Sequence, residues 1–291
     1  MSKKRKDNGA GDGNYSVVTQ KGRIIMKSLQ GVESTLFIPL AARVFASKKF
    51  PEYFYDEKSL AMEKYIPGDT IREKSSEYAF MASVARYYNM DNMVKSFISK
   101  HRKCNIVYLG AGLETAYYRL NNPSTLFYEV DLPEVIDIRR SILGEHENEI
   151  LLDGDMFDTV WIDKINAALP SLLIVSGVFQ YFTEEKVVRF ITDIRAGLKG
   201  AELIFDATNE TGIKYANRYV RKTGNTGALM HFYVNDSIDF ARKTGTVLIE
   251  ERVFFTDARK VLAKKLGFYT RIAMRIVDNK KRAIILHLKI N

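Results

Sequence analysis

The sequence predicts an α/β protein: a doubly wound parallel sheet that ends in an antiparallel strand and follows a helical N-terminal region. Two observations support this fold class. After Cys104, short β-rich runs alternate with amphipathic segments, as expected for βαβ units whose helices cover both faces of a parallel sheet. Before Cys104, apolar residues recur every three and four positions, which is typical of helices. Right-handed crossovers then define the doubly wound topology.

The first hundred residues divide into a tail and a set of helices. Residues 1–13 are polar, charged and glycine-rich, and predict a disordered basic tail. Pro51 and the Pro67-Gly68 pair interrupt the helical pattern that follows. The expected helices are 15–30, 32–47, 57–65, 75–89 and 90–100.

The remainder alternates strands and helices before its pattern changes. The expected strands are 105–110, 125–130, 149–154, 171–176 and 201–207, with helices near 114–120, 133–143, 159–168, 183–198 and 211–222. A strand at 246–255 and a helix at 257–267 ended by glycine come next, and 271–277 with 283–290 predict a hairpin. We therefore expect a helical region over 14–101 that forms part of the active-site wall, and a ligand-binding domain over 102–291 with a helical cap insertion near 208–245.

The composition predicts a folded cytoplasmic protein. Of 291 residues, 46% are hydrophobic and 12% aromatic, which is enough for a large core. No apolar stretch approaches the roughly 18 residues that span a bilayer, and no apolar segment follows the basic opening as in a secretory signal. The mean hydropathy of −0.18 agrees with this, so no membrane partner is expected.

Net charge and cysteine content limit the classes of ligand and metal site that the sequence predicts. The net charge of +9 favours anionic partners, but the basic residues are dispersed, so we expect no nucleic acid. The single cysteine, Cys104, excludes a disulfide framework and most zinc sites, and the four histidines lack metal-ligand spacing. The sequence therefore predicts no metal, and no oligomeric state is predicted.

The first candidate binding motif follows the strand at 105–110. Gly110-Ala111-Gly112 lies between this strand and a helix, where glycine permits a sharp turn and close approach of a ligand to the backbone. A plain strand-to-helix turn is the alternative. Thr115 occupies the third glycine position of the dinucleotide fingerprint, which disfavours a nicotinamide cofactor.

Acidic residues end the next two strands. Glu129 and Asp131 compete for the role of an acid that accepts hydrogen bonds from a ribose diol; alternatively, Asp131 is the N-cap of the helix that begins at Pro133. After the third strand, Asp155 is a candidate acceptor for an adenine amino group, with Met156 against the ring. A helix cap is the alternative for such an acid.

The segment 176–182 follows the fourth strand, at the edge where α/β proteins bind ligands. Ser176 ends this strand, and Tyr181 either faces the ligand or packs in the core. Farther along, His231 is the one candidate for a general base, with a surface or structural histidine as the alternative.

Taken together, these motifs resemble the leucine carboxyl methyltransferase family, which includes bacterial O-methyltransferases similar to the tetracenomycin polyketide enzyme. The likeness rests on LGAGLETAYYRL (109–120) and FYEVDLPEVI (127–136), and extends to ESTLFIPLAARVFASKKFPEYFYDEKSLA (33–61) and VARYYNMDNMVKSFI (84–98). It covers most of residues 15–200 and implies a Rossmann-like class I methyltransferase sheet.

The resemblance implies S-adenosylmethionine as cofactor and S-adenosylhomocysteine as product. It assigns Arg86 to the cofactor carboxylate, Gly110 and Gly112 to the adjacent turn, and Asp131 to the ribose. Asp155 and Met156 match the adenine contacts, Tyr181 matches an aromatic near the methionine end, and Arg43 matches a second cation. Departures from the family pattern are Glu114 for aspartate, Ala116 for arginine and Ser176 for glutamate.

The expected reaction is methyl transfer to a carboxylate or hydroxyl of a small molecule, with Tyr181 and His231 as candidate catalytic residues. A carboxylate acceptor needs no base, whereas a hydroxyl acceptor benefits from one. Methylation of a protein C-terminal carboxylate, or cofactor binding without catalysis, are the alternatives.

Overall fold

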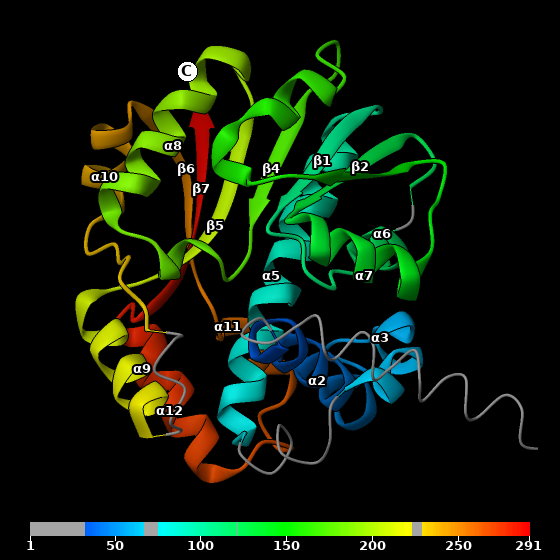
Figure 1. Cartoon of the computed structure of the whole chain (residues 1–291). Helices are drawn as coiled ribbons and strands as arrows, with labels where there is room; N and C mark the ends of the chain where they lie inside the picture. Colours follow the sequence, from blue (N-terminus) through cyan, green and yellow to red (C-terminus); the bar gives the residue numbers. More distant parts are fainter. Residues whose placement is uncertain (1–32, 67–74, 121, 223–228) are drawn as a thin grey trace, which may run out of the picture.

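The computed structural model describes residues 33–66, 75–120, 122–222 and 229–291 (Figure 1). The predicted tail at 1–13 and the predicted helix at 15–30 lie outside these residues. The N-terminal region contains α2 (Glu33–Lys49), α3 (Glu57–Ala61), the 3-10 helix η1 (Glu63–Tyr65) and α5 (Glu77–Lys100).

A single helix, α5, replaces the two helices that were predicted over 75–100. Ser76 caps its N-terminus by accepting a hydrogen bond from the Ala79 N–H, and the helix continues unbroken for 24 residues. The prediction of a break was wrong because its polar residues are satisfied by tertiary contacts. Asn89 donates to the carbonyls of Ala85 and Phe254, and Asp91 pairs with Arg119.

In the described part of the chain, the sheet has seven strands in the order β3-β2-β1-β4-β5-β7-β6. The first five are parallel, and β7 lies antiparallel between β5 and β6. The predicted doubly wound sheet with a C-terminal antiparallel strand is therefore confirmed. The strands are β1 (Cys104–Leu109), β2 (Thr125–Asp131), β3 (Glu149–Asp153), β4 (Ser171–Val175), β5 (Glu202–Thr208), β6 (Thr246–Val253) and β7 (Ala283–Ile290).

Helices cover both faces of the sheet. They are α6 (Ala116–Leu120), α7 (Pro133–Leu143), α8 (Glu184–Gly197), α9 (Glu210–Lys222), α10 (Ser237–Thr244), α11 (Thr256–Val261) and α12 (Phe268–Asn279). The predicted helix at 159–168 is instead the short 3-10 helix η3 (Val160–Lys164). A second 3-10 helix, η2 (Met156–Asp158), precedes it, and Thr159 between the two adopts a left-handed φ of 57°. A further 3-10 helix, η4 (Phe179–Tyr181), follows β4.

The C-terminal hairpin prediction was wrong. Residues 271–277 belong to α12, whose buried residues Thr270, Met274 and Asp278 recur every four positions, and β7 pairs with β5 and β6 instead. Gly267 does not end a long helix either: α11 ends at Val261, and Gly267 is the N-cap residue of α12. The apolar and basic residues in this segment fit both the strand period of two and the helix period of about 3.6. Packing of one helical face selects the helix.

The two faces of the sheet have separate cores. Ile106 and Tyr108 of β1 pack in the layer that includes α5 and α12, whereas Val107 and Leu109 pack in the layer that includes α8 and α10. In Figure 1, β4 points toward the half of the molecule that holds α2, α9 and α12, and β7 points the opposite way. The carboxyl ends of the parallel strands, where α/β proteins bind ligands, therefore face the N-terminal half of α5.

Candidate active site

The glycine turn after β1 requires glycine at two positions. Gly110 and Gly112 have φ values of 70° and 52°, in the left-handed region. A Cβ on Gly110 would lie 2.6 Å from Cγ2 of Val178, and one on Gly112 would lie 3.1 Å from Cδ2 of Leu36. The buried Ala111 lies between them. The turn is thus enclosed by α2 on one side and by the loop after β4 on the other.

Asp131 connects the end of β2 to this turn. Its Oδ2 accepts a hydrogen bond from the Gly112 N–H at 2.7 Å, and its Oδ1 accepts one from the Leu132 N–H at 2.8 Å. Burial raises the pKa of Asp131 in spite of these two hydrogen bonds. Leu132, the N-cap residue of α7, receives no side-chain cap, so Asp131 is bound to the glycine turn and does not cap that helix.

Glu129, the competing acid, lies deeper in the same strand. It is fully buried, and its carboxylate is 3.2 Å from the guanidinium of Arg139 on α7. Burial raises the pKa of Glu129 well above its usual range, and the neighbouring Glu149 contributes. Arg139 also donates to the carbonyls of Gly112 and Glu114. Glu129 therefore acts on the glycine turn indirectly, because its partner Arg139 donates hydrogen bonds to that turn.

Arg86 reaches the carboxyl end of β4 from α5. Its Nη1 lies 3.3 Å from Oδ2 of Asp206 on β5, and Oδ1 of Asp206 accepts a hydrogen bond from the Gly177 N–H at 2.6 Å. Burial lowers the pKa of Arg86, but Asp206, Tyr87 and Tyr181 outweigh this effect and raise it. Asp206 thus holds both the guanidinium and the turn after β4.

The other edge of this guanidinium is free. Among the described residues, Nε of Arg86 is buried without a hydrogen-bond partner, and Nη2 has none either. The side chain lies directly over Gly177, where a Cβ would be 2.6 Å from Nη1. Nε and Nη2 together form the edge with which arginine binds a carboxylate through two hydrogen bonds. The hydroxyl of Ser176 is also buried without a described partner.

Three other predicted residues lie near these groups. Tyr181, in η4, is half-buried and acts electrostatically on Arg86. His231 is exposed, and its backbone N–H donates to the carbonyl of Gln180 at 2.7 Å, which places its segment beside the Tyr181 loop. Asp155 is exposed and caps η2 by accepting from the Phe157 N–H, whereas Met156 is buried with its side chain in the core.

Arg43 belongs to a buried network beneath the glycine turn. It is 1% exposed and donates to Oγ1 of Thr115 and to the carbonyl of Leu113, each at 2.6 Å. Its guanidinium is thus hydrogen-bonded within this network. The network also includes the buried charged side chains of Asp56, Asp91, Glu114 and Arg119.

Sequence reasoning missed Asp206 and this network. Asp206 is an acid near the end of the predicted strand 201–207. An acid in this position is the signal that identified Asp131, so the sequence could also have identified Asp206. The network has no local signal, because its members come from α2, α5, α6 and the loops between. Burial raises the pKa of Glu114 and Asp56, but Arg119 and Arg43 outweigh it and lower both. These carboxylates are therefore structural anions.

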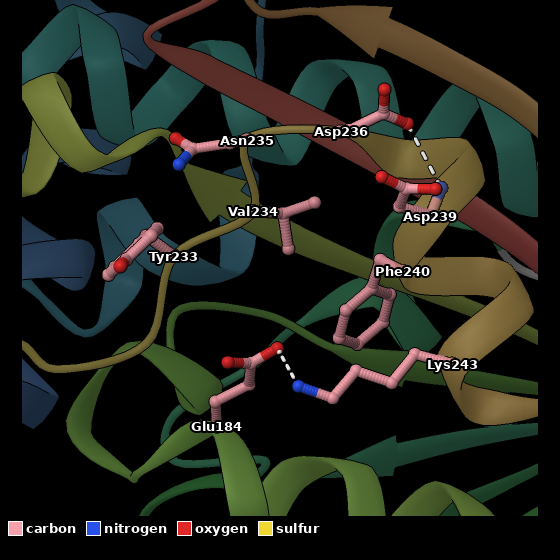
Figure 2. A pocket seen from close by; sticks show the side chains of 8 residues that line it. All are labelled: Glu184, Tyr233, Val234, Asn235, Asp236, Asp239, Phe240 and Lys243. Atoms are coloured by element: carbon pink, nitrogen blue, oxygen red, sulfur yellow. Dashed lines mark hydrogen bonds and ion pairs between the residues drawn. The ribbon is translucent and has the colours of Figure 1, made fainter.

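A surface hollow of about 210 Å³ lies beside the loop that carries His231 (Figure 2). Across it, Lys243 of α10 donates to Glu184 of α8 at 2.7 Å. It contains none of the predicted site residues. Its lining is Glu184, Tyr233, Val234, Asn235, Asp236, Asp239, Phe240 and Lys243.

Within the described residues, no group of three or more His, Cys, Asp or Glu side chains is arranged to hold a metal ion. No helix in this part of the chain is long and apolar enough to cross a membrane.

Comparison with known proteins gives a consistent result. The model of the leucine carboxyl methyltransferase family matches residues 26–195. The tetracenomycin polyketide synthesis O-methyltransferase TcmP of Streptomyces glaucescens is 22% identical over 80% of this chain and 88% of its own length. Leucine carboxyl methyltransferase 1 of Rattus norvegicus is 26% identical over 35% of this chain and 41% of its own length.

Solved structures share the fold. A crystal structure of a protein assigned as a methyltransferase from Thermobifida fusca aligns with a TM-score of 0.56 and 16% identity, covering 86% of this chain and 94% of that chain. A DUF574 family protein from Streptomyces avermitilis aligns with a TM-score of 0.55 and 15% identity, covering 86% and 97%.

Proposed function

Because this chain belongs to the leucine carboxyl methyltransferase family, we propose that it transfers a methyl group from S-adenosylmethionine to a carboxylate or hydroxyl oxygen of a small molecule. The observation that carries the proposal is the free Nε and Nη2 edge of Arg86, held over Gly177 by Asp206. A guanidinium edge that has no partner among the described residues is suited to the carboxylate of the cofactor's methionine part.

The other predicted contacts fit the same ligand because they follow adjacent strands at one edge of the sheet. Asp131 accepts the ribose hydroxyls, and the turn at Gly110, Ala111 and Gly112 permits close approach of the cofactor. Asp155 and Met156 follow β3, whose Asp153 is in register with Asp131 on β2. In this arrangement Asp155 receives the adenine amino group, Met156 borders the ring, and Ser176 supplies a hydroxyl near Arg86.

The protein's part in the chemistry is alignment and exclusion of water. When bound, S-adenosylmethionine supplies an electrophilic methyl group on a sulfonium. Arg86 would hold the methionine carboxylate and Asp131 the ribose, on either side of the sulfonium, which sets the direction from which an acceptor oxygen must approach. A carboxylate acceptor needs no base; for a hydroxyl acceptor, Tyr181 and His231 are the candidate groups beside the loop after β4.

The relatives favour a small-molecule acceptor over a protein carboxyl terminus. The match to the polyketide O-methyltransferase spans 88% of that enzyme, whereas the match to leucine carboxyl methyltransferase 1 spans 41% of it. The sequence departures at Glu114 and Ala116 lie in the buried network and in α6.

The testing experiment is a transfer assay with radiolabelled S-adenosylmethionine and a cell extract divided into protein and small-molecule fractions. We expect base-labile or base-stable methylated products, for carboxylate and hydroxyl acceptors respectively, in the small-molecule fraction only. Label confined to protein would contradict the acceptor class. No label in either fraction, with no binding of S-adenosylhomocysteine, would contradict the proposed activity.

A further inference from the structure

Among the residues that the structure describes, the arginine in the turn between α12 and β7 has no acidic partner. Arg282 directly precedes β7 and is half-buried, and it makes no ion pair with any carboxylate among the described residues. Its neighbour Lys281, by contrast, pairs with Glu251 at 2.7 Å. The ring centroid of Tyr215 on α9 lies 4.9 Å from Cζ of Arg282. The guanidinium is thus partly desolvated, lies against an aromatic face and retains an uncompensated charge.

The backbone around Arg282 is held firmly. Gly212 of α9 packs directly on it, since a Cβ at that position would lie 2.5 Å from the Arg282 carbonyl oxygen. The Arg282 N–H donates to the carbonyl of Val277 at 2.9 Å, and Asn209 donates to the carbonyl of Lys280 at 3.0 Å. The cation therefore projects from a fixed turn that docks on the first turn of α9.

The strand register places Arg282 at the same edge of the sheet as Arg86. Asp206, the partner of Arg86, is in register with Ile285 on β7, and Thr208 is in register with Ala283. Arg282 is therefore three residues beyond Asp206, or about 10 Å at a strand rise of about 3.3 Å per residue. The hydroxyl of Thr208, one step before it, is buried without a partner among the described residues.

We propose that Arg282 binds a carboxylate of the methyl acceptor, with Tyr215 flanking an aromatic body of that acceptor. The proposal rests on the proposed function, and narrows its substrate class to aromatic carboxylic acids. Guanidinium pairs with a carboxylate through two hydrogen bonds, and tyrosine faces add stacking area. Arg218, whose Cζ is 5.6 Å from the Tyr215 ring, extends the positive charge outward from this subsite.

The test is calorimetric titration of a panel of aromatic acids, each with its neutral amide: benzoate, phenylacetate, 4-hydroxybenzoate and indole-3-acetate. Wild type is titrated with and without saturating S-adenosylhomocysteine. We expect at least one acid to bind tenfold or more tightly than its amide. Arg282→Gln should abolish this preference, Arg282→Lys should reduce it, and Arg275→Gln, at an exposed position on α12, should retain it.

The outcomes separate the two proposals. A panel without any acid preference, or a preference that persists in Arg282→Gln, overturns the subsite. S-adenosylhomocysteine should bind all variants as it binds wild type, which shows that Arg282→Gln is folded. If S-adenosylhomocysteine fails to bind wild type, the proposed function fails, while the acid preference of cofactor-free protein still decides the role of Arg282.

Discussion

At the scale of single residues, the two edges of the Arg86 guanidinium have different partners. Nη1 pairs with Asp206, whereas Nε and Nη2 have no partner among the described residues. Arg86→Lys preserves the charge but loses the two-pronged edge. We expect it to weaken S-adenosylhomocysteine binding about tenfold or more, given about 1.5–3 kcal/mol for a hydrogen bond to a charged group. Calorimetric titration measures this change.

The specificity of that loss is checked with a trimmed ligand. 5′-Methylthioadenosine has no carboxylate, so wild type and Arg86→Lys should bind it equally well. Arg102→Lys, at an exposed position after α5, serves as the matched control and should bind both ligands as wild type does. Equal weakening of both ligands by Arg86→Lys would show that the arginine acts through the fold and not through the carboxylate.

At the scale of elements, the turn after β4 connects that strand to η4 and α8. Gly177 has a φ of 73°, and a Cβ there would lie 2.6 Å from Nη1 of Arg86. Gly177→Ala should therefore have two effects: backbone strain of about 1 kcal/mol from the left-handed conformation, and displacement of the guanidinium. We expect lower stability in urea unfolding and weaker binding of S-adenosylhomocysteine.

A second glycine separates these two effects. Gly200, in the turn before β5, has a φ of 82°, and a Cβ there would meet nothing within 4 Å. Gly200→Ala should lose a similar amount of stability by backbone strain and keep full ligand affinity. Loss of affinity in both variants, or in neither, would contradict the direct contact between Gly177 and Arg86.

At the scale of the whole molecule, buried acids make stability depend on pH. The pKa of Glu129 is well above its usual range in the folded chain, chiefly through burial. The unfolded chain therefore loses this proton at lower pH than the folded chain does. Glu129 stabilises the fold below its unfolded pKa, and this contribution is lost as pH rises toward its folded pKa. Glu129→Gln should therefore gain stability relative to wild type as pH rises.

Urea unfolding of both proteins at pH 5 and pH 8 measures this difference. Arg139 keeps its 2.6 Å contact with Glu149 in the variant, so it is not left unpaired. Glu134→Gln, at an exposed position on α7, controls for the loss of one carboxyl group. If Glu129→Gln instead became less stable relative to wild type as pH rose, Glu129 would be ionised in the folded chain.

The local pattern of the sequence was sufficient for the frame of the molecule. Short β-rich runs between amphipathic segments identified the five parallel strands, because strand and helix periods are properties of neighbouring residues. The glycine turn was likewise readable, since the need for glycine arises from its own backbone angles at Gly110 and Gly112. The C-terminal segment 271–277 was not, because its apolar residues suit either period and only packing on the sheet layer selected α12.

The candidate site depended on contacts between distant segments. Glu129 and Asp131 are both acids near the end of the same strand, so the sequence does not distinguish them. In the structure Glu129 is buried beside Arg139, whereas Asp131 accepts a hydrogen bond from the glycine turn. Arg86 and Asp206 are 120 residues apart, and nothing near either residue predicts their pairing. The sequence by itself determined the fold class, the family resemblance and the residue types available at the sheet edge. Only the tertiary structure decided which of these side chains are paired in the core and which remain able to bind a ligand. The reason is that burial and charge pairing depend on segments that folding brings together.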